Sequence, residues 1–150
     1  MSKNENLINN IGESFFDFQS KLQFFEREYL RKCDINDISI SEIKVLYRIG
    51  ISNTKSMSDI ANELKITKGT LSITVNSLVK KGYVIRNRHK QDRRVIILYL
   101  TTKAIKAVKT YQKFYVLLLN ELVNSDEDSK TLLDILKRLN AILNDEFYED

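Results

Sequence analysis

The chain has 150 residues, 43% hydrophobic and 29% charged, which is the size and composition of one ordinary globular domain. Proline is absent and only 4 residues are glycine, a composition that favours long helices. No apolar run approaches the ~20 residues of a membrane span, and the N-terminus lacks the apolar core of a secretory signal. We therefore expect a cytoplasmic protein with no membrane partner.

The side chains of catalysis and metal binding are scarce. Cys33 is the one cysteine and His89 the one histidine, so we expect no internal disulfide, metal site or cofactor. An enzyme would need a nucleophile–base pair, paired carboxylates or a phosphate loop. Neither G-x-G-x-x-G nor a GK[ST] loop occurs, so we do not expect an enzyme.

The net charge of +4 is unevenly distributed. Residues 51–110 hold 13 Lys and Arg against 3 Asp and Glu, a balance of +10, whereas residues 111–150 hold 4 against 9. A basic middle of this kind is typical of a polyanion-binding module, although a solvated basic face without a partner would look the same.

Taken in chain order, the first element is a long helix. Apolar residues recur at alternating spacings of three and four from Ile8 to Tyr29, and Phe16 and Phe24 widen this stripe. One small domain does not easily cover so much apolar surface, so we expect a second copy of the chain to cover it, a helical pair within the chain being the alternative. The residues expected in this homodimer interface are Ile8, Ile11, Phe15, Phe18, Leu118, Leu122, Leu132, Ile135, Leu136, Leu139, Ile142 and Leu143.

Two capping signals follow. Ser39 and Glu42 have the spacing of a capping box and predict a second helix that ends at Gly50. Ser56, with Asp59 three residues later, predicts a short third helix.

A tight turn at Lys65 and Ile66 separates this short helix from a fourth one, which Thr67 caps and which runs to about Lys81. The two helices have the arrangement of a helix-turn-helix. The buried stripe of the fourth helix is predicted to be Leu71, Val75, Leu78 and Val79.

Residues 83–87 and 95–100 are rich in β-branched and aromatic side chains and predict a hairpin, and helical periodicity resumes at Thr101. The expected fold is mainly α with a small two-stranded β wing. It is one domain over residues 1–150, in which a winged helix-turn-helix (39–100) is flanked by long dimerisation helices (1–33 and 101–150).

The second helix of a helix-turn-helix enters the major groove of DNA. Opposite the predicted buried stripe, Asn76 suits a bidentate bond to adenine and Ile73 a thymine methyl, and Ser77 shares this face. Thr67, Lys68 and the helix N-terminus suit a phosphate. The candidate DNA-binding residues here are Thr67, Lys68, Gly69, Thr70, Ser72, Ile73, Asn76 and Lys80, the alternative being a plain solvated face.

The hairpin tip holds 4 Lys and Arg within residues 88–94. A basic finger suits a narrow A·T-rich minor groove or the phosphate backbone, the alternative being a solvated charged turn. Asp92 is expected to pair with Arg94 and orient it. The candidate DNA-binding residues of the tip are Arg88, His89, Lys90, Asp92, Arg93 and Arg94.

The run from Ser56 to Thr101 resembles the DNA-binding core of MarR-type regulators, through I-A-x-x-L, L-V-K-K-G-Y-V-x-R, D-R-R and a closing L-x-L-T. The resemblance implies a homodimeric transcription regulator, usually a repressor, on an inverted repeat of double-stranded DNA. It also implies that Arg94 enters the minor groove. The chain departs from the family where Ile73 replaces a frequent arginine and Lys65 and Ala104 replace frequent glycines. A winged-helix protein-interaction module without DNA binding is the alternative function.

D-I-S-I-S-E-I, T-K-G-T-L and the stretch from K-G-Y-V to D-R-R-V resemble the branch of the family that represses fatty-acid synthesis genes. This finer resemblance implies acyl-acyl carrier protein as the effector. Family members commonly bind a small molecule between the dimerisation helices and the DNA-binding lobe. The candidates for such a site are Phe24, Phe25, Tyr29, Ile40, Tyr47 and Tyr111, with simple core packing as the favoured alternative.

Some relatives sense oxidants through a cysteine near the start of the first helix. Cys33 instead lies near the end of that helix, between Lys32 and Asp34, so we interpret it as an inert thiol.

Overall fold

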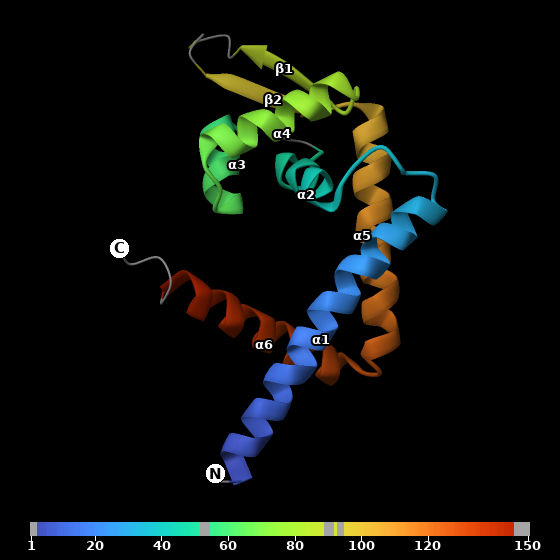
Figure 1. Ribbon diagram of the computed structural model, residues 1–150, viewed down its shortest axis with the longest axis vertical. Helices are drawn as coiled ribbons and strands as arrows, with labels where there is room; N and C mark the ends of the chain where they lie inside the picture. Colours follow the sequence, from blue (N-terminus) through green and yellow to red (C-terminus); the bar gives the residue numbers. More distant parts are fainter. Residues whose placement is uncertain (1–2, 52–54, 89–91, 93–94, 146–150) are drawn as a thin grey trace. The chain divides into compact units, whose positions relative to one another are not determined.

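The computed structural model describes residues 3–51, 55–88, 92 and 95–145 of the chain. Two compact units, Met1–Gln112 and Lys113–Asp150, divide it within the fifth helix. The elements are α1 (Lys3–Lys32), α2 (Ile40–Ile49), α3 (Met57–Leu64), α4 (Lys68–Lys80), β1 (Val84–Arg88), β2 (Ile96–Leu100), α5 (Thr102–Leu122) and α6 (Asp126–Asp145) (Figure 1). The predicted class, mainly helical with a two-stranded wing, is confirmed.

Three predicted helix caps are present. Ser39 Oγ accepts from the Glu42 N–H at 3.1 Å while the Ser39 N–H donates to Glu42 Oε2 at 2.8 Å, so the predicted capping box opens α2. Ser56 and Asp59 form a second such box at the start of α3. The helix α2 ends at Gly50, whose φ of 77° lies in the region that favours glycine.

The end of α4 fixes where the hairpin begins. Gly82 has a φ of 75°, and the Tyr83 N–H donates to the Leu78 carbonyl at 2.9 Å, closing the last turn of the helix. Because that N–H is used by the helix, β1 begins at Val84 and not at the predicted Tyr83. The strands are antiparallel, with Val84 opposite Leu100 and Arg88 opposite Ile96.

One core lies between α2, α3, α4 and the hairpin, which are gathered together in Figure 1. Every one of these elements contributes side chains that are almost completely buried, as the burial of apolar surface requires. They are Ile43, Leu46, Ile49, Ile60, Leu71, Val75, Leu78, Val84 and Leu98.

Val79 does not join this core, contrary to prediction, since 37% of its surface is exposed. At 3.6 residues per turn, Val79 points about 75° away from the centre of the stripe formed by Leu71, Val75 and Leu78. It therefore lies at the edge of the buried face.

The terminal helices present apolar side chains to the outside. Phe15 of α1 is 50% exposed and Leu122 of α5 is 59% exposed. In the second unit α6 begins beyond a break at residues 123–125, where Ser125 Oγ accepts from the Asp128 N–H at 3.1 Å. Of the predicted interface residues, all are exposed except Leu132, which is half-buried.

Candidate nucleic-acid interface

The turn between α3 and α4 is built by the backbone. Lys65 ends α3 with a φ of 53° and a ψ of 43°. This is the left-handed conformation, which costs glycine less free energy than residues with a side chain. The Ile66 N–H donates back to the Ala61 carbonyl at 3.1 Å. Thr67 then caps α4, since its Oγ1 accepts from the Thr70 N–H at 3.1 Å. The predicted helix-turn-helix is therefore present.

The outward face of α4 is small and polar around one apolar side chain. Ile73 is 73% exposed, the most exposed of the large hydrophobic side chains in the described residues. Around it the candidate residues Thr67, Lys68, Gly69, Thr70, Asn76 and Lys80 are exposed, and Ser72 is half-buried. The residues of α4 that are predicted to contact DNA thus lie on one accessible surface.

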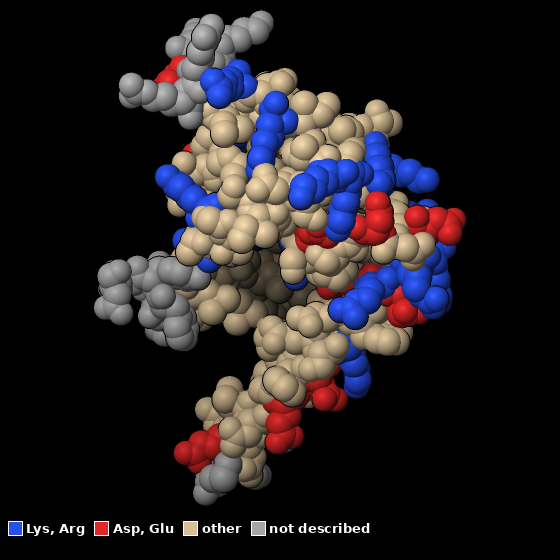
Figure 2. Space-filling view, turned by 45° about the horizontal axis from the view of Figure 1, so that its top comes forward, with Lys and Arg blue, Asp and Glu red and all other residues tan. Residues whose placement is uncertain are grey.

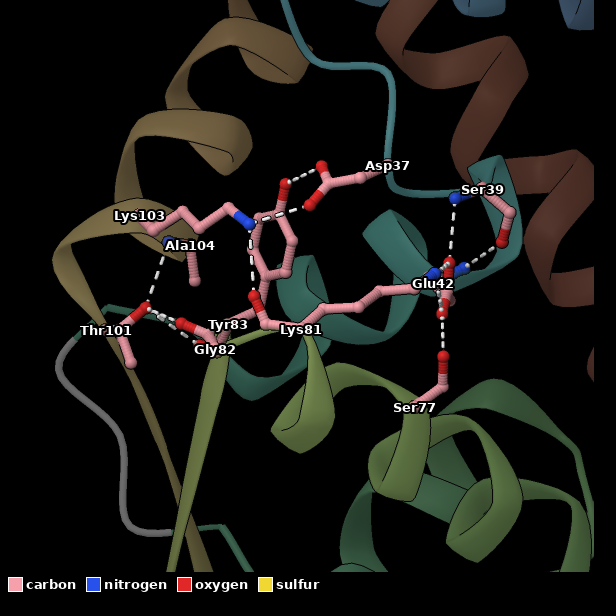
Figure 3. A network of polar contacts seen from close by, with 10 residues as sticks. All are labelled: Asp37, Ser39, Glu42, Ser77, Lys81, Gly82, Tyr83, Thr101, Lys103 and Ala104. Atoms are coloured by element: carbon pink, nitrogen blue, oxygen red, sulfur yellow. Dashed lines mark hydrogen bonds and ion pairs between the residues drawn. The ribbon is translucent and has the colours of Figure 1, made fainter.

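A carboxylate of α2 fixes one flank of α4. Glu42, which is only 8% exposed, accepts from Ser77 Oγ at 2.6 Å and from Lys81 Nζ at 2.8 Å (Figure 3). Ser77 therefore faces α2, and its predicted place on the outward face is wrong, because the carboxylate draws its hydroxyl inward.

Burial alone would raise the pKa of Glu42, but the hydrogen bonds from Lys81, Ser77 and the Ser39 backbone outweigh burial and lower it from 4.5 to about 2. Glu42 is therefore ionised at neutral pH. It joins the start of α2 to the end of α4 by charge-assisted hydrogen bonds.

An arginine of the hairpin holds the other flank. Arg86 Nη1 donates to Asn76 Oδ1 at 2.6 Å, and Arg86 Nη2 lies 3.4 Å from the Ser72 carbonyl oxygen. Arg86, the last residue of the L-V-K-K-G-Y-V-x-R motif, is not among the predicted site residues. The alternation of a strand gave a usable signal, since it places Arg86 on the same face as the buried Val84.

A second polar cluster joins the start of α5 to the end of α4. Asp37 accepts from Tyr83 Oη at 2.6 Å and from Lys103 Nζ at 2.7 Å, and Lys103 also donates to the Lys81 carbonyl at 3.0 Å (Figure 3). Thr101 Oγ1 donates to the Gly82 carbonyl at 2.8 Å and accepts from the Ala104 N–H at 3.3 Å.

Hydrogen bonds from Lys103 and Tyr83 lower the pKa of Asp37. Burial and the bond to Asp37 raise the pKa of Tyr83, so its hydroxyl remains a donor at neutral pH. This cluster is not predictable from spacing in the sequence, because its members are spread from the loop before α2 to the first turn of α5.

Only part of the predicted hairpin tip lies within the described residues. Arg88 and Asp92 are exposed, and the Asp92 carbonyl accepts from the Val95 N–H at 3.0 Å. His89, Lys90, Arg93 and Arg94 lie outside the described residues, and so does the predicted pairing of Asp92 with Arg94. In Figure 2, Lys and Arg side chains are spread over the top of the molecule, around the hairpin.

The six candidate ligand-binding residues have different environments. Tyr111 is buried and its hydroxyl donates to the buried Glu26 Oε1 at 2.7 Å. Phe24 and Phe25 are exposed and pack edge to face against each other, and Tyr47 is exposed. Tyr29 and Ile40 are half-buried.

Cys33 is a half-buried free thiol. The described part of the chain contains no group of three or more His, Cys, Asp or Glu placed to hold a metal ion. Within the same residues, no helix has the length and apolar character of a membrane span.

A helix-turn-helix followed by an antiparallel hairpin defines the winged helix-turn-helix class. The family model described as MarR family matches residues 36–95. The chain is 28% identical over 109 residues to the uncharacterized HTH-type transcriptional regulator YfiV of Bacillus subtilis (strain 168), covering 71% of this chain and 68% of that one. It is 27% identical over 127 residues to the HTH-type transcriptional regulator BilQ of Clostridium symbiosum (strain WAL-14163), covering 81% and 84%.

Among solved structures, Streptococcus pneumoniae FabT in complex with DNA matches with a TM-score of 0.84 and 29% identity, over 92% of this chain and 98% of that one. The S. aureus MepR–DNA complex matches with a TM-score of 0.70 and 22% identity, over 87% and 96%, a likeness of fold alone. Residues 36–95 of the chain are thus similar to the MarR family, and the relatives named above are transcriptional regulators, not enzymes.

Proposed function

We propose that the protein is a homodimer that binds an inverted repeat of double-stranded DNA by its sequence and thereby regulates transcription. The observation that carries this proposal is the outward face of α4, where Ile73 stands 73% exposed among small polar side chains. Such a face suits the major groove, in which an apolar side chain contacts the thymine methyl group. FabT, which has the same fold, was solved with DNA, and this supports the proposal.

The positive charge of α4 and of the hairpin also supports the proposal that this surface binds DNA. Lys68 and Lys80 of α4 and Arg88 of the hairpin are exposed, and residues 51–110 carry a balance of +10, from 13 Lys and Arg against 3 Asp and Glu. Cations on the reading helix and the hairpin neutralise phosphates and make binding sensitive to salt. Within this proposal Arg94 contacts the minor groove, as the family resemblance implies.

The uncovered apolar side chains of α1, α5 and α6 support the homodimer. The twelve predicted interface residues are accessible or half-buried in the single chain, and burying them against a second copy would remove a large apolar area from water. A dimer also places two copies of α4 about one turn of DNA apart, which matches an inverted repeat. We therefore assign residues 39–100 to DNA binding and residues 1–33 and 101–150 to dimerisation, within one domain.

Repression is the proposed mode of action, modulated by a ligand, and the cytoplasm is the proposed compartment. The finer proposal is control of fatty-acid synthesis genes with acyl-acyl carrier protein as effector. The sequence runs shared with that branch and the match to FabT support it. A ligand acts only if it favours one arrangement of the dimer over another.

The test is fluorescence anisotropy with duplexes from upstream of the protein's own gene and of any neighbouring lipid-synthesis genes, at two salt concentrations. We expect tight, salt-sensitive binding, and tightening by acyl-acyl carrier protein if the finer proposal holds. Lys68→Glu and Arg94→Ala should each weaken binding tenfold or more, roughly the loss of one good contact, and leave the dimer intact. Lys130→Glu, on α6, is the matched control. A folded dimer that binds none of these duplexes, nor any from a random pool, contradicts the proposal.

A further inference from the structure

Arg86 of β1 lies along the side of α4 that Ser72 and Asn76 share. Its Nη1 donates to Asn76 Oδ1 at 2.6 Å, and its Nη2 lies 3.4 Å from the Ser72 carbonyl oxygen. Ser72 and Asn76 are four residues apart and therefore lie one above the other on the helix. The shorter contact makes Asn76 the principal partner of this guanidinium.

This contact fixes which end of the Asn76 amide faces the hairpin. A guanidinium has five N–H donors and no acceptor, so only an oxygen can satisfy it. Turning the amide over would place its NH₂ group against the Arg86 N–H groups, donor against donor. The orientation thus follows from the chemistry of the two side chains.

The guanidinium of Arg86 makes hydrogen bonds to α4 through its two terminal nitrogens only. Its Nε is buried and has no hydrogen-bond partner among the described residues. A buried donor without an acceptor destabilises the folded chain, and an aliphatic side chain would avoid that cost. What an arginine adds at this position is the short bond from Nη1 to Asn76 and the longer one from Nη2 to the Ser72 carbonyl.

We propose that Arg86 is a positioning residue that directs the Nδ2 donors of Asn76 toward DNA, so that Asn76 selects guanine in place of adenine. This inference rests on the proposed DNA binding by α4. Asn76 is exposed and lies one turn beyond Ile73 on the outward face, where its free end can reach a base edge.

The preference follows from the edges that bases present in the major groove. An unrestrained asparagine pairs with adenine by accepting from N6 and donating to N7, which needs both ends of the amide. Here the oxygen is drawn toward Arg86, and the donor end is left for the base. Guanine offers two acceptors, N7 and O6, whereas adenine offers one acceptor and one donor and cytosine offers a donor. Guanine therefore suits a donor best.

The experiment is selection of bound duplexes from a random pool by the full chain, followed by sequencing. The wild-type protein should enrich guanine over adenine by about tenfold at one position of each half-site, roughly the discrimination of one good base contact. Asn76→Ala should remove that preference alone. Arg86→Met, which keeps an unbranched stem without donors, should shift the same position toward adenine.

Two comparisons separate positioning from mere loss of charge. Arg88→Met removes an exposed cation of the same strand, so it should lower affinity at every sequence and leave the base preferences unchanged. In the Asn76→Ala background, Arg86→Met should have no further effect on the position, because Arg86 acts through Asn76. Melting and elution volume verify that each variant is a folded dimer.

An unchanged guanine preference in folded Arg86→Met overturns the inference. Adenine at the Asn76-dependent position of the wild-type site overturns it too, and this result does not depend on whether Arg86→Met folds. Both outcomes leave the proposed function standing, since a specific site was enriched. Failure to enrich any sequence would instead remove the proposed function, and the inference with it.

Discussion

The winged helix-turn-helix and the terminal helices differ in how much of their apolar surface the single chain buries. Between α2, α3, α4 and the hairpin, the chain buries its large aliphatic side chains against its own residues. On α1 and on the unit Lys113–Asp150, similar side chains such as Phe15 and Leu139 remain accessible in the single chain.

The difference indicates what each region needs in order to be complete. The winged region has its own core and polar contacts on both flanks of α4, so its packing is complete within a single chain. The terminal helices carry an apolar stripe without a cover, and we propose that a second copy supplies it. Reading DNA and forming the dimer are then assigned to regions that mutations can perturb separately.

The largest expected effect is on the dimer. Leu139→Glu places a charge in the proposed interface, where its burial without a partner is costly. We expect the dissociation constant of the dimer to rise about 100-fold or more, in line with the loss of an interface hot spot. Sedimentation velocity across a concentration series measures it.

Lys137→Glu is the matched control, because Lys137 lies on α6 opposite the apolar stripe and should leave the dimer unchanged. If both variant dimers dissociate to the same extent, or if neither dissociates, the apolar stripe of α6 is not the interface.

The next effect concerns the flank of α4. Glu42→Ala leaves Lys81 and Ser77 without their shared carboxylate, and we expect it to lower the free energy of unfolding by about 3 kcal/mol. Glu63→Ala breaks the more exposed ion pair with Lys55 and should cost no more than about 1 kcal/mol. Urea denaturation compares the two. Similar losses would mean that the Glu42 cluster contributes no more to the free energy of unfolding than the exposed ion pair does.

The same carboxylate gives the stability a pH dependence. The pKa of the Glu42 carboxyl is about 2 in the folded chain and 4.5 in the unfolded chain. Its contribution to the free energy of unfolding is therefore complete above about pH 4.5 and is lost as the pH falls toward 2. That contribution is on the order of 3 kcal/mol. The lowered pKa of Asp37 acts in the same direction. Urea midpoints between pH 7 and 3 should fall less steeply for Glu42→Gln than for the wild-type protein, and equal slopes would rule out the Glu42 contribution.

The smallest expected effect is at the turn of the helix-turn-helix. Lys65→Gly relieves a left-handed conformation but adds freedom to the unfolded chain, and the net gain in stability should be roughly 0.5–1 kcal/mol. Lys68→Gly, in the first turn of α4, should instead lower stability by up to ~1 kcal/mol. Thermal melting measures both, and a destabilised Lys65→Gly would show that the lysine side chain outweighs the strain of its backbone.

Local signals predicted most of the winged region. The caps at Ser39, Ser56 and Thr67 are confirmed, because a cap depends on residues within one turn of the helix. Val79 was misplaced because apolar character alone does not say where the edge of a buried face falls. Tyr83 was assigned to the strand because its residue type favours strands, whereas its N–H closes α4.

The candidate site was predicted in its composition and not in its polar contacts. The outward residues of α4 follow from helical periodicity, but Ser77 turned inward toward Glu42, a residue 35 positions away in the sequence. The bond from Arg86 to Asn76 crosses from strand to helix, and that from Lys103 to Asp37 spans 66 positions. No spacing rule within one element reports such contacts, because the tertiary fold creates them.

Two copies of α4 that contact two half-sites together require a fixed spacing between those half-sites, and a change of that spacing tests this requirement. Anisotropy would compare the selected inverted repeat with a duplex carrying about 5 extra base pairs, half a helical turn, between its halves. We expect the insertion to reduce binding to the level of a scrambled duplex, because the half-sites then face opposite sides of the DNA. Equal affinity for both duplexes would contradict this requirement.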